Sequence, residues 1–175
     1  MRLRGPAAAI DLTGPTTCRV IDSQQQREVI ARLGPDPLDG GRKSDVWNKI
    51  SVSRKPIGAL LLDQTVIAGV GNIFRAEVLF DIELHPEVRG DQLTRATFDQ
   101  LWRSLTKAMR TGLKYGRIIT VTSAEAGVPL AKVQGKDRFR IYGKPDCPRC
   151  GRSIETIELA SRRLYVCKGC QTLRR

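Results

Sequence analysis

Apolar residues recur along much of this chain at the three-and-four spacing of an amphipathic helix. The clearest stripe lies within 94–113 and contains Phe98, Leu101, Trp102, Leu105, Ala108, Met109 and Leu113. This spacing predicts a helix whose apolar face lies in the core. Trp102 could serve as a platform for base stacking, but an aromatic ring inside an apolar stripe is expected to pack there instead.

Four other segments carry helical signals. Ser23, with Gln26 three residues later, has the pattern of a capping box and predicts a helix that runs through Val29, Ile30 and Leu33 to Gly34. The remaining three are a helix capped by Ser44 that turns Val46, Trp47 and Ile50 inward, a helix over 57–62 with Pro56 at its first turn, and a longer apolar helix from about Asn72 to Ile82.

Two segments show neither the helical nor the strand period. Residues 34–41 are rich in Gly, Pro and Asp and are interpreted as a linker. Residues 120–137 include a Gly-Val-Pro run and a further glycine, and we expect a mobile loop there.

The first 21 residues have the pattern of short strands. Apolar positions in 2–4, 8–12 and 16–21 are separated by Gly-Pro pairs, which favour turns. Three strands alone make a poor domain, so they are interpreted as the end of a larger sheet. Cys18 lies in the last of these runs and is expected to be a reduced, buried thiol.

Four cysteines near the C-terminus form two matched pairs. Cys147 and Cys150 make one Cys-x-x-Cys, and after sixteen residues Cys167 and Cys170 make the other. This spacing is typical of a zinc ribbon, in which two knuckles joined by a hairpin supply four thiolates to one ion. Disulfides or a redox pair are the alternatives, and two matched pairs in a chain with no visible signal peptide argue against both. Four sulfur ligands leave no position for water, so the predicted zinc is structural.

The charge of the chain points to a polyanionic partner. The 175 residues are 41% hydrophobic, as in a globular protein, but they carry a formal net charge of +12. Residues 132–175 hold twelve Lys or Arg against four acids. A basic surface binds phosphates, although it also fits a membrane surface or simple solubility. No apolar run approaches the length of a membrane span, and we expect a cytosolic protein.

A glycine-rich turn between two apolar helical segments is suited to binding an anion. The run from Asp63 to Asn72 contains Gly69 and Gly71 directly before a predicted helix start. Glycines allow close approach of a phosphate, the first NH groups of a helix are unpaired, and the Asn72 amide can donate as well. A tight turn in which Asn72 merely caps its helix is an equally good explanation of this spacing.

These motifs together resemble those of a known family. The run from Leu60 to Phe80, the pair His85-Pro86 and the four-cysteine finger that ends Cys170-Gln171 are similar to the formamidopyrimidine-DNA glycosylase and endonuclease VIII family, closest to the endonuclease VIII-like branch. The resemblance covers about 24–171. It implies a base-excision repair protein that removes oxidised bases and then cleaves the abasic strand.

The resemblance also implies roles for particular residues. Asn72 matches the asparagine that binds backbone phosphate near the lesion, and Gly71 supplies a main-chain NH. Arg162 matches the hairpin arginine that clamps the phosphates flanking the flipped nucleotide, while the match of Arg163 is weaker and a solvated charge is the alternative for Arg162. His85 falls where the family has a turn and is not expected to be catalytic.

The start of the chain departs from the family pattern. Family members begin with a mature N-terminal proline followed by glutamate, and the proline amine attacks the sugar C1′. This chain begins Met-Arg-Leu-Arg, with no Pro-Glu near the start and no counterpart of the strand lysine. Two explanations stay open, a late start of a longer protein and a natural truncation. We expect no catalytic residue in these 175 residues and hence DNA binding without cleavage.

The resemblance and the patterns together imply a mainly α fold. A helix-two-turn-helix domain is followed by a β-hairpin zinc ribbon, with a few N-terminal strands left from an incomplete β-sandwich. The expected boundaries are 1–22 for the remnant strands, 23–119 for the helix-two-turn-helix DNA-binding domain, 120–137 for the loop and 138–175 for the zinc-ribbon finger.

The function expected from the resemblance is damaged-DNA binding, as the C-terminal part of a bifunctional glycosylase and abasic-site lyase. The partner is double-stranded DNA with damaged bases or abasic sites, the cofactor is one structural Zn²⁺, and the protein is expected to be a monomer in the bacterial cytosol or nucleoid. The alternatives are a nonenzymatic zinc-ribbon protein that binds nucleic acid and a paralogue that only occupies lesions.

Overall fold

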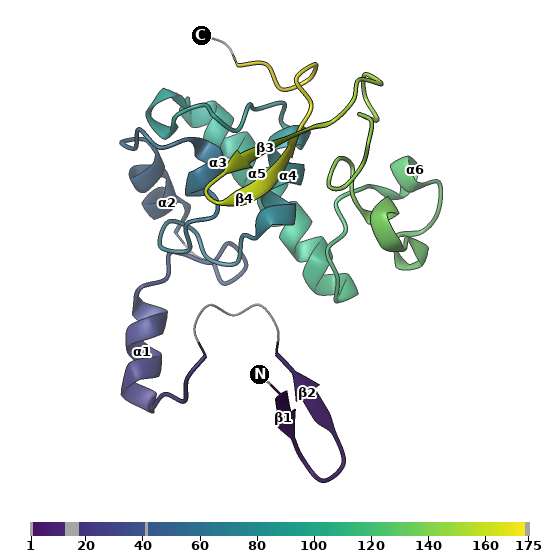
Figure 1. Ribbon diagram of the computed structural model, residues 1–175. Helices are drawn as coiled ribbons and strands as arrows, with labels where there is room; N and C mark the ends of the chain where they lie inside the picture. The colour runs from purple at the N-terminus through teal and green to yellow at the C-terminus, as the bar shows by residue number, and fades with distance from the viewer. Residues whose placement is uncertain (1, 13–17, 41, 174–175) are drawn as a thin grey trace. The chain divides into compact units, whose positions relative to one another are not determined.

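The computed structural model describes residues 2–12, 18–40 and 42–173. The chain divides into two compact units, residues 1–32 and residues 33–175 (Figure 1). Each unit is considered by itself. In the described part of the chain, no helix is both long and apolar enough to cross a membrane.

The first unit contains a small hairpin and one helix. β1 (Arg2–Arg4) pairs antiparallel with β2 (Ala9–Asp11), in the register Leu3 opposite Ile10. α1 (Ser23–Ala31) follows, and its cap is Asp22 instead of the predicted Ser23. Asp22 accepts a hydrogen bond from the Gln25 NH at 2.8 Å, and the Gln25 side chain bonds back to the Asp22 NH. Aspartate and serine are similarly good caps, so the capping box forms one residue earlier than predicted.

The predicted third strand does not form over its described residues. Residues 18–22 have no strand or helix, and the positions 16–17 lie outside the described residues. Cys18 is exposed, so the prediction of a buried thiol was wrong. Every described residue of this unit up to Arg32 is exposed, which leaves no core in which a thiol could be buried.

The second unit is built from helices and one hairpin (Figure 1). The helices are α2 (Lys43–Ile50), α3 (Ile57–Leu60), α4 (Asn72–Asp81), α5 (Arg95–Tyr115) and α6 (Ser123–Ala126), with 3₁₀ turns at Gly90–Gln92, Leu130–Lys132 and Gly135–Arg138. The prediction for α4 is confirmed to within one residue. α2 has Arg42 at its N-cap position with no side-chain cap, so the predicted cap at Ser44 was wrong.

α5 supplies one wall of the main hydrophobic core. Thr94 caps it by accepting a hydrogen bond from the Thr97 NH at 3.1 Å, and Gly116 ends it with a φ of 63°. The buried members of its stripe are Phe98, Leu101, Leu105 and Met109. Full burial of each contributes roughly 1.5–3 kcal/mol. They pack with residues of α2, α3 and α4 in one cluster.

The predicted stripe on α5 is correct except at its end. Trp102 is half-buried, and its ring lies 6.2 Å from that of Phe98, so its role is packing, as predicted. Leu113 is 73% exposed and lies outside the core. The buried apolar face therefore ends at Met109, about one and a half turns before the helix does.

The predicted linker is packed against the rest of the second unit. The Gly34 NH donates to the Gln64 carbonyl at 2.7 Å, and the Ala68 NH donates to the Pro35 carbonyl at 3.1 Å. A Cβ at Gly34 would lie 2.5 Å from the backbone of Val66, which only glycine avoids. Composition indicated the absence of regular structure but not this docking.

The C-terminal hairpin shares a second core with α4. β3 (Glu155–Leu159) pairs antiparallel with β4 (Arg162–Val166). Leu164 and Val166 are buried with Ala76 and Phe80 of α4, in a cluster that also includes Cys147 and Cys167. The finger is therefore attached to the helical part by apolar packing on α4 as well as by the chain.

Residues 120–137, for which a mobile loop was predicted, contain short helical elements. They hold α6 and two 3₁₀ turns, and Val121 and Val133 are buried together with Ile119 in a small third cluster. Thr122 caps α6 with a reciprocal capping box to Glu125. Short helical turns of three or four residues show no period in sequence, which explains why the pattern did not reveal them.

Candidate nucleic-acid interface and metal site

The four cysteines of the finger converge on one point. Their Sγ atoms all lie within 4.8 Å of one another. The Cys147–Cys170 and Cys150–Cys167 pairs are separated by 3.7 and 3.4 Å between sulfurs. A tetrahedral zinc with Zn–S bonds of about 2.3 Å requires edges of about 3.8 Å, so this donor set fits one Zn²⁺ and confirms the predicted ligands.

The surroundings of the sulfurs show why a cation is needed there. The Arg152 backbone NH is the main cause that lowers the pKa of Cys150 to about 7. Burial raises the pKa of Cys167 and of Cys170. Thiolates are the ligand form, and a divalent ion would supply the positive charge that keeps these two sulfurs deprotonated.

The hairpin tip presents Arg162 at its edge. Ala160 and Ser161 join the strands, and both have a positive φ, of 55° and 56°. A two-residue turn with two left-handed residues matches the twist of the strands, although Asn-Gly is the usual choice. Such strain in non-glycine residues is often found at functional sites. Arg162 follows directly, pairs across the hairpin with Leu159, and is exposed.

The turn before α4 is held by a side-chain amide. The Gln64 Nε2 donates to the Val70 carbonyl at 2.9 Å, and its Oε1 accepts from the Gly69 NH at 2.9 Å. Gly69 has a φ of 79°, a conformation that favours glycine. The Thr65 hydroxyl donates to Asp63 and lowers the pKa of that carboxyl. The sequence pattern did not single out Gln64. Its role in holding the turn depends on hydrogen bonds to residues five and six positions later in the chain.

Asn72 is the first residue of α4 and does not cap it. The N-cap is Gly71, which makes no side-chain bond. The Asn72 Nδ2 donates to the Arg163 carbonyl at 2.8 Å, across to the hairpin. An amide nitrogen carries two hydrogens, so one remains for another acceptor beside the unpaired NH groups at the start of α4.

A buried arginine orients this asparagine. Arg75 is fully buried, and its guanidinium donates to the carbonyls of Gly58 and Leu159 at 3.2 and 3.0 Å and to the Asn72 Oδ1. Burial, together with the nearby Arg162, lowers its pKa to about 10, so it stays charged at neutral pH. Arg75 thus links α3, α4 and the hairpin. The signal in the sequence was a charged residue within a mainly apolar helical run.

One groove brings the predicted phosphate ligands together. Gly71, Asn72 and Arg162 line it, along with Lys55, Gln64 and Ala160 among others. Arg162 makes no ion pair with any residue that the structure describes. The groove therefore combines helix-start NH groups, an amide donor and cations, which is the chemistry of a phosphate-binding surface.

Comparison with known families decides the relationship. A model of the formamidopyrimidine-DNA glycosylase H2TH domain matches residues 33–124, more than half of the chain. A model of the zinc finger found in FPG and IleRS matches residues 146–173. The chain belongs to the formamidopyrimidine-DNA glycosylase and endonuclease VIII family. The resemblance inferred from sequence is confirmed.

Relatives and solved structures of the family match much of this chain. Endonuclease 8 1 of Mycobacterium tuberculosis is 42% identical over 98% of the chain, and a formamidopyrimidine-DNA glycosylase of Thermomicrobium roseum is 34% identical over 88%. The Lactococcus lactis Fpg in complex with abasic-site DNA superposes with a TM-score of 0.71 over 87% of the chain, at 29% identity. The chain spans 65%, 54% and 57% of those three proteins.

His85 has a structural place in this family member. It is 7% exposed, and its Nδ1 accepts the Glu87 NH at 3.2 Å. Burial lowers the pKa of the imidazole, which keeps it neutral at physiological pH. These contacts agree with a turn residue, as predicted.

Proposed function

We propose that this chain binds the sugar–phosphate backbone of damaged duplex DNA through the groove that contains Gly71, Asn72 and Arg162. The observation that carries the proposal is that two segments 90 residues apart in sequence, the start of α4 and the hairpin tip, line the same groove. Membership of the glycosylase family indicates that the ligand of this groove is DNA. The related Lactococcus lactis structures hold DNA with an abasic site and with Fapy-dG.

The proposed contacts divide between a neutral and a charged part. The Gly71 and Asn72 NH groups and the free Asn72 hydrogen would donate to one phosphate, and Arg162 would hold a neighbouring phosphate with its guanidinium fork. The hydrogen bond from Asn72 to the Arg163 carbonyl fixes the two parts relative to each other. Because these groups meet the backbone and not base edges, the groove would position DNA without reading its sequence.

We further propose that the complete protein is a bifunctional glycosylase and abasic-site lyase for oxidised bases, in which this chain is the DNA-binding part. The strands β1 and β2 would belong to the end of its N-terminal β-sandwich. A nonenzymatic ribbon protein explains the zinc and the charge, but not the H2TH match or the groove.

Arg162→Ala is expected to weaken binding to duplex DNA by about 10- to 100-fold, because a charge-assisted contact to phosphate is lost. The slope of log K against log salt should fall by about 0.9, since one cation fewer releases counterions. Asn72→Ala should weaken binding about 5- to 10-fold with an unchanged slope, because the amide is neutral. Fluorescence anisotropy with a duplex containing an abasic analogue, over a salt series, measures both quantities.

Arg163→Ala is the matched control. Successive side chains of a strand point to opposite faces, so Arg163 should matter less than its neighbour Arg162. Undamaged duplex and single-stranded RNA serve as competitors. Unchanged affinity in both groove variants would remove the site assignment, and preference for RNA would favour the nonenzymatic ribbon protein.

Borohydride trapping tests the absence of lyase chemistry in these 175 residues. The family nucleophile is an N-terminal proline amine, and no Pro-Glu pair occurs near the start of this chain. We therefore expect no covalent adduct with abasic-site DNA after reduction, while a full-length relative assayed in parallel gives one. An adduct would identify an amine nucleophile among the residues of this chain.

A further inference from the structure

We propose that the outer face of α5 is a second, independent binding surface for a DNA backbone. Four cations form it: Arg103, Lys107, Arg110 and Lys114, which we call the α5 basic stripe. All four side chains are exposed. The proposal goes beyond the function assigned to the groove at α4 and the hairpin, and it does not depend on that assignment.

The spacing of the stripe places its charges in one line. The four positions follow one another at intervals of four, three and four residues along a continuous helix. With about 100° of rotation per residue, they fall within about 60° of the helix surface and extend over about 17 Å. A duplex presents one phosphate charge per about 1.7 Å of its axis, so a line of this length can meet several phosphates.

The stripe is not neutralised within the protein. Arg103, Lys107, Arg110 and Lys114 form no ion pair with a described residue. Arg95, on the same helix, is by contrast paired: its guanidinium lies 3.1 Å from Asp99, which also pairs with Lys43 at 2.7 Å. Asp99 is the one acid within α5, and it precedes the stripe.

Like charges at these intervals oppose helix formation. Each such pair costs about 0.2–0.5 kcal/mol, and the stripe contains three consecutive pairs. Binding to a polyanion relieves this repulsion. The stripe is thus an arrangement that is slightly unfavourable in the unbound protein and favourable on a phosphate backbone.

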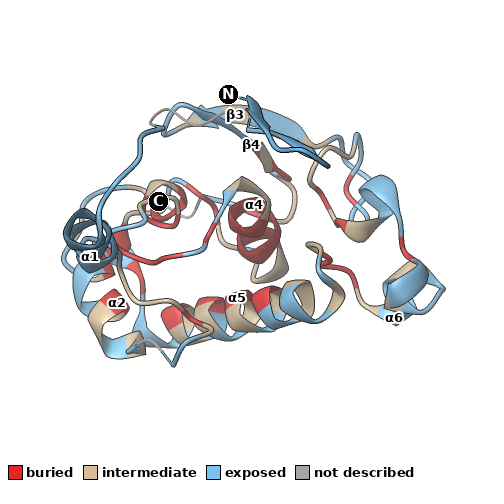
Figure 2. Ribbon diagram, turned by 90° about the horizontal axis from the view of Figure 1, so that it is seen from below, coloured by how far each residue is buried: buried red, intermediate tan, exposed pale blue. Residues whose placement is uncertain are grey.

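The stripe and the groove face different directions. The buried residues of α5, such as Leu101 and Leu105, are about half a turn away from Arg103 and Lys107 on the helix surface. Figure 2 shows α4 between α5 and the β3–β4 hairpin, with the exposed side of α5 turned away from α4. A straight duplex in the groove therefore cannot also lie along the stripe.

The chemistry favours a nucleic-acid backbone over an acidic protein. Protein interfaces place apolar and aromatic residues at their centre and exclude charge from it. Here the centre consists of cations. The two aromatics beside it are both half-buried: Trp102 packs against Phe98, and Tyr115 lies under Lys114, whose Nζ is 5.5 Å from the ring centroid. Affinity would come from counterion release, which needs no apolar core.

The test is the number of duplexes that one chain binds. Short undamaged duplexes of about 15 base pairs are titrated at low salt, and sedimentation velocity gives the protein-to-DNA ratio. Energy transfer between donor- and acceptor-labelled duplexes then reports bridging. We expect two duplexes per chain, and four phosphate contacts predict about a 100-fold loss of the second affinity between about 50 and 200 mM salt.

Charge removal at the stripe isolates its contribution. The variant carries Arg103→Gln, Lys107→Gln, Arg110→Gln and Lys114→Gln, and glutamine keeps the helix propensity. It should bind one duplex with an affinity within about twofold of the unmodified first site, show no bridging, and melt at an equal or higher temperature. The control removes the same charge elsewhere, at exposed positions, with Arg27→Gln, Arg32→Gln, Lys132→Gln and Lys136→Gln.

Three results would overturn the proposal. They are a single duplex per unmodified chain at low salt, equal loss of the second duplex in stripe and control variants, and tighter binding of the stripe to a polyglutamate peptide than to DNA. Loss of the first duplex in Arg162→Ala, with one duplex still bound by the stripe and no bridging, concerns the groove alone. The two sites can therefore fail separately.

Discussion

Removing the metal is expected to unfold the finger and to weaken duplex binding by at least about 100-fold, while α2–α5 stay folded. Structural zinc contributes about 10–16 kcal/mol of apparent binding free energy at neutral pH, and because the ligands are ordered only when zinc binds, this free energy stabilises the folded finger. Without it the hairpin loses its knuckles. Arg162 then leaves the groove, and the Arg163 carbonyl no longer accepts from Asn72.

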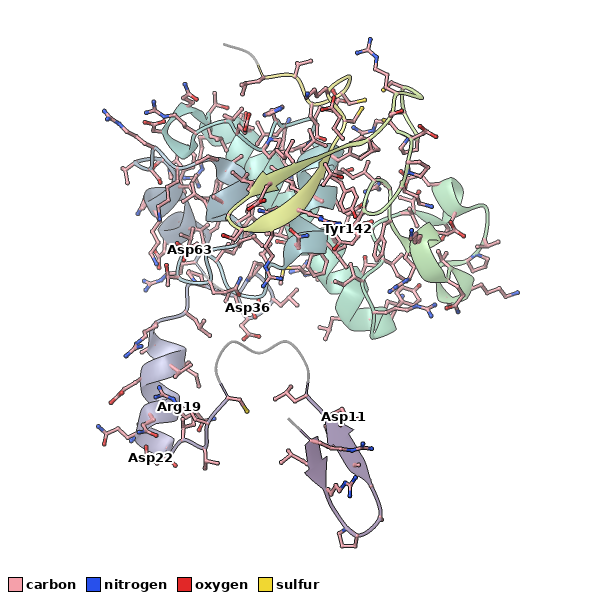
Figure 3. All side chains as sticks on the ribbon, in the orientation of Figure 1. Asp11, Arg19, Asp22, Asp36, Asp63 and Tyr142 are labelled. Carbon is pink, nitrogen blue, oxygen red and sulfur yellow. The ribbon has the colours of Figure 1, made fainter. Side chains whose placement is uncertain are left out.

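The distribution of aromatic residues allows both parts to be followed. The two tryptophans, Trp47 and Trp102, belong to the helical core and should keep their fluorescence after chelation. Tyr142, labelled in Figure 3, packs against Tyr165 of β4 with ring centroids 4.9 Å apart. Its near-ultraviolet circular dichroism should be lost together with the zinc.

Cysteine variants provide the matched control for the metal. Cys150→Ser removes one of the four ligands and should reproduce most of the effect of chelation. Cys18→Ser changes a cysteine that lies outside the ligand set and should change neither zinc content nor DNA affinity. If a chain shown to be free of zinc binds duplex DNA as tightly as the holo form, the finger does not contribute to the groove.

Local patterns predicted the parts of the structure that depend on neighbouring residues. The cysteine spacing gave the ligand set, because two knuckles and a hairpin need little else. The apolar period of α5 and the run of α4 were long enough to decide their type and their buried faces. The cap of α1 was displaced by one residue, from Ser23 to the adjacent Asp22, because both side chains can cap. The cap predicted at Ser44 does not form at all.

Contacts between distant segments could not be predicted in the same way. Asn72 and Arg163 are 91 residues apart, and the hydrogen bond between them follows from the packing of α4 on the hairpin. Arg75 is charged, and its burial is tolerated because carbonyls distant in sequence accept hydrogen bonds from its guanidinium. Sequence alone shows the residue types, whereas their partners depend on the assembled fold.

Replacement of Glu77 by leucine is expected to destabilise the second unit by about 3–5 kcal/mol and to lower its melting temperature by about 10 °C. Glu77 is 1% exposed. Its carboxylate accepts the NH groups of Arg140, Ile141 and Tyr142 at 2.8, 2.9 and 2.8 Å. The Thr120 hydroxyl donates to it as well, at 2.6 Å.

The cost arises because the leucine leaves several donors buried without an acceptor, and each such group costs about 1–3 kcal/mol. Residues 140–142 lead directly into the first cysteine knuckle, so Glu77 also holds the base of the finger on α4. DNA affinity measured well below the melting temperature should therefore fall too. Glu77→Gln keeps one oxygen but turns an NH₂ toward NH donors. Its melting temperature should therefore lie between those of the unmodified protein and Glu77→Leu.

Glu83→Leu is the control for a carboxylate just beyond the C-terminal end of α4. Glu83 is exposed and pairs with Arg149 at 3.2 Å on the surface, where an ion pair contributes about 0–1 kcal/mol. Thermal unfolding and denaturant midpoints should therefore barely change in this variant. Three backbone NH groups converge on the Glu77 carboxylate, so Glu77→Leu should destabilise the protein far more than Glu83→Leu. A comparably small effect of both variants would mean that water reaches these NH groups when the carboxylate is absent. The finger would then be attached to α4 by apolar packing alone.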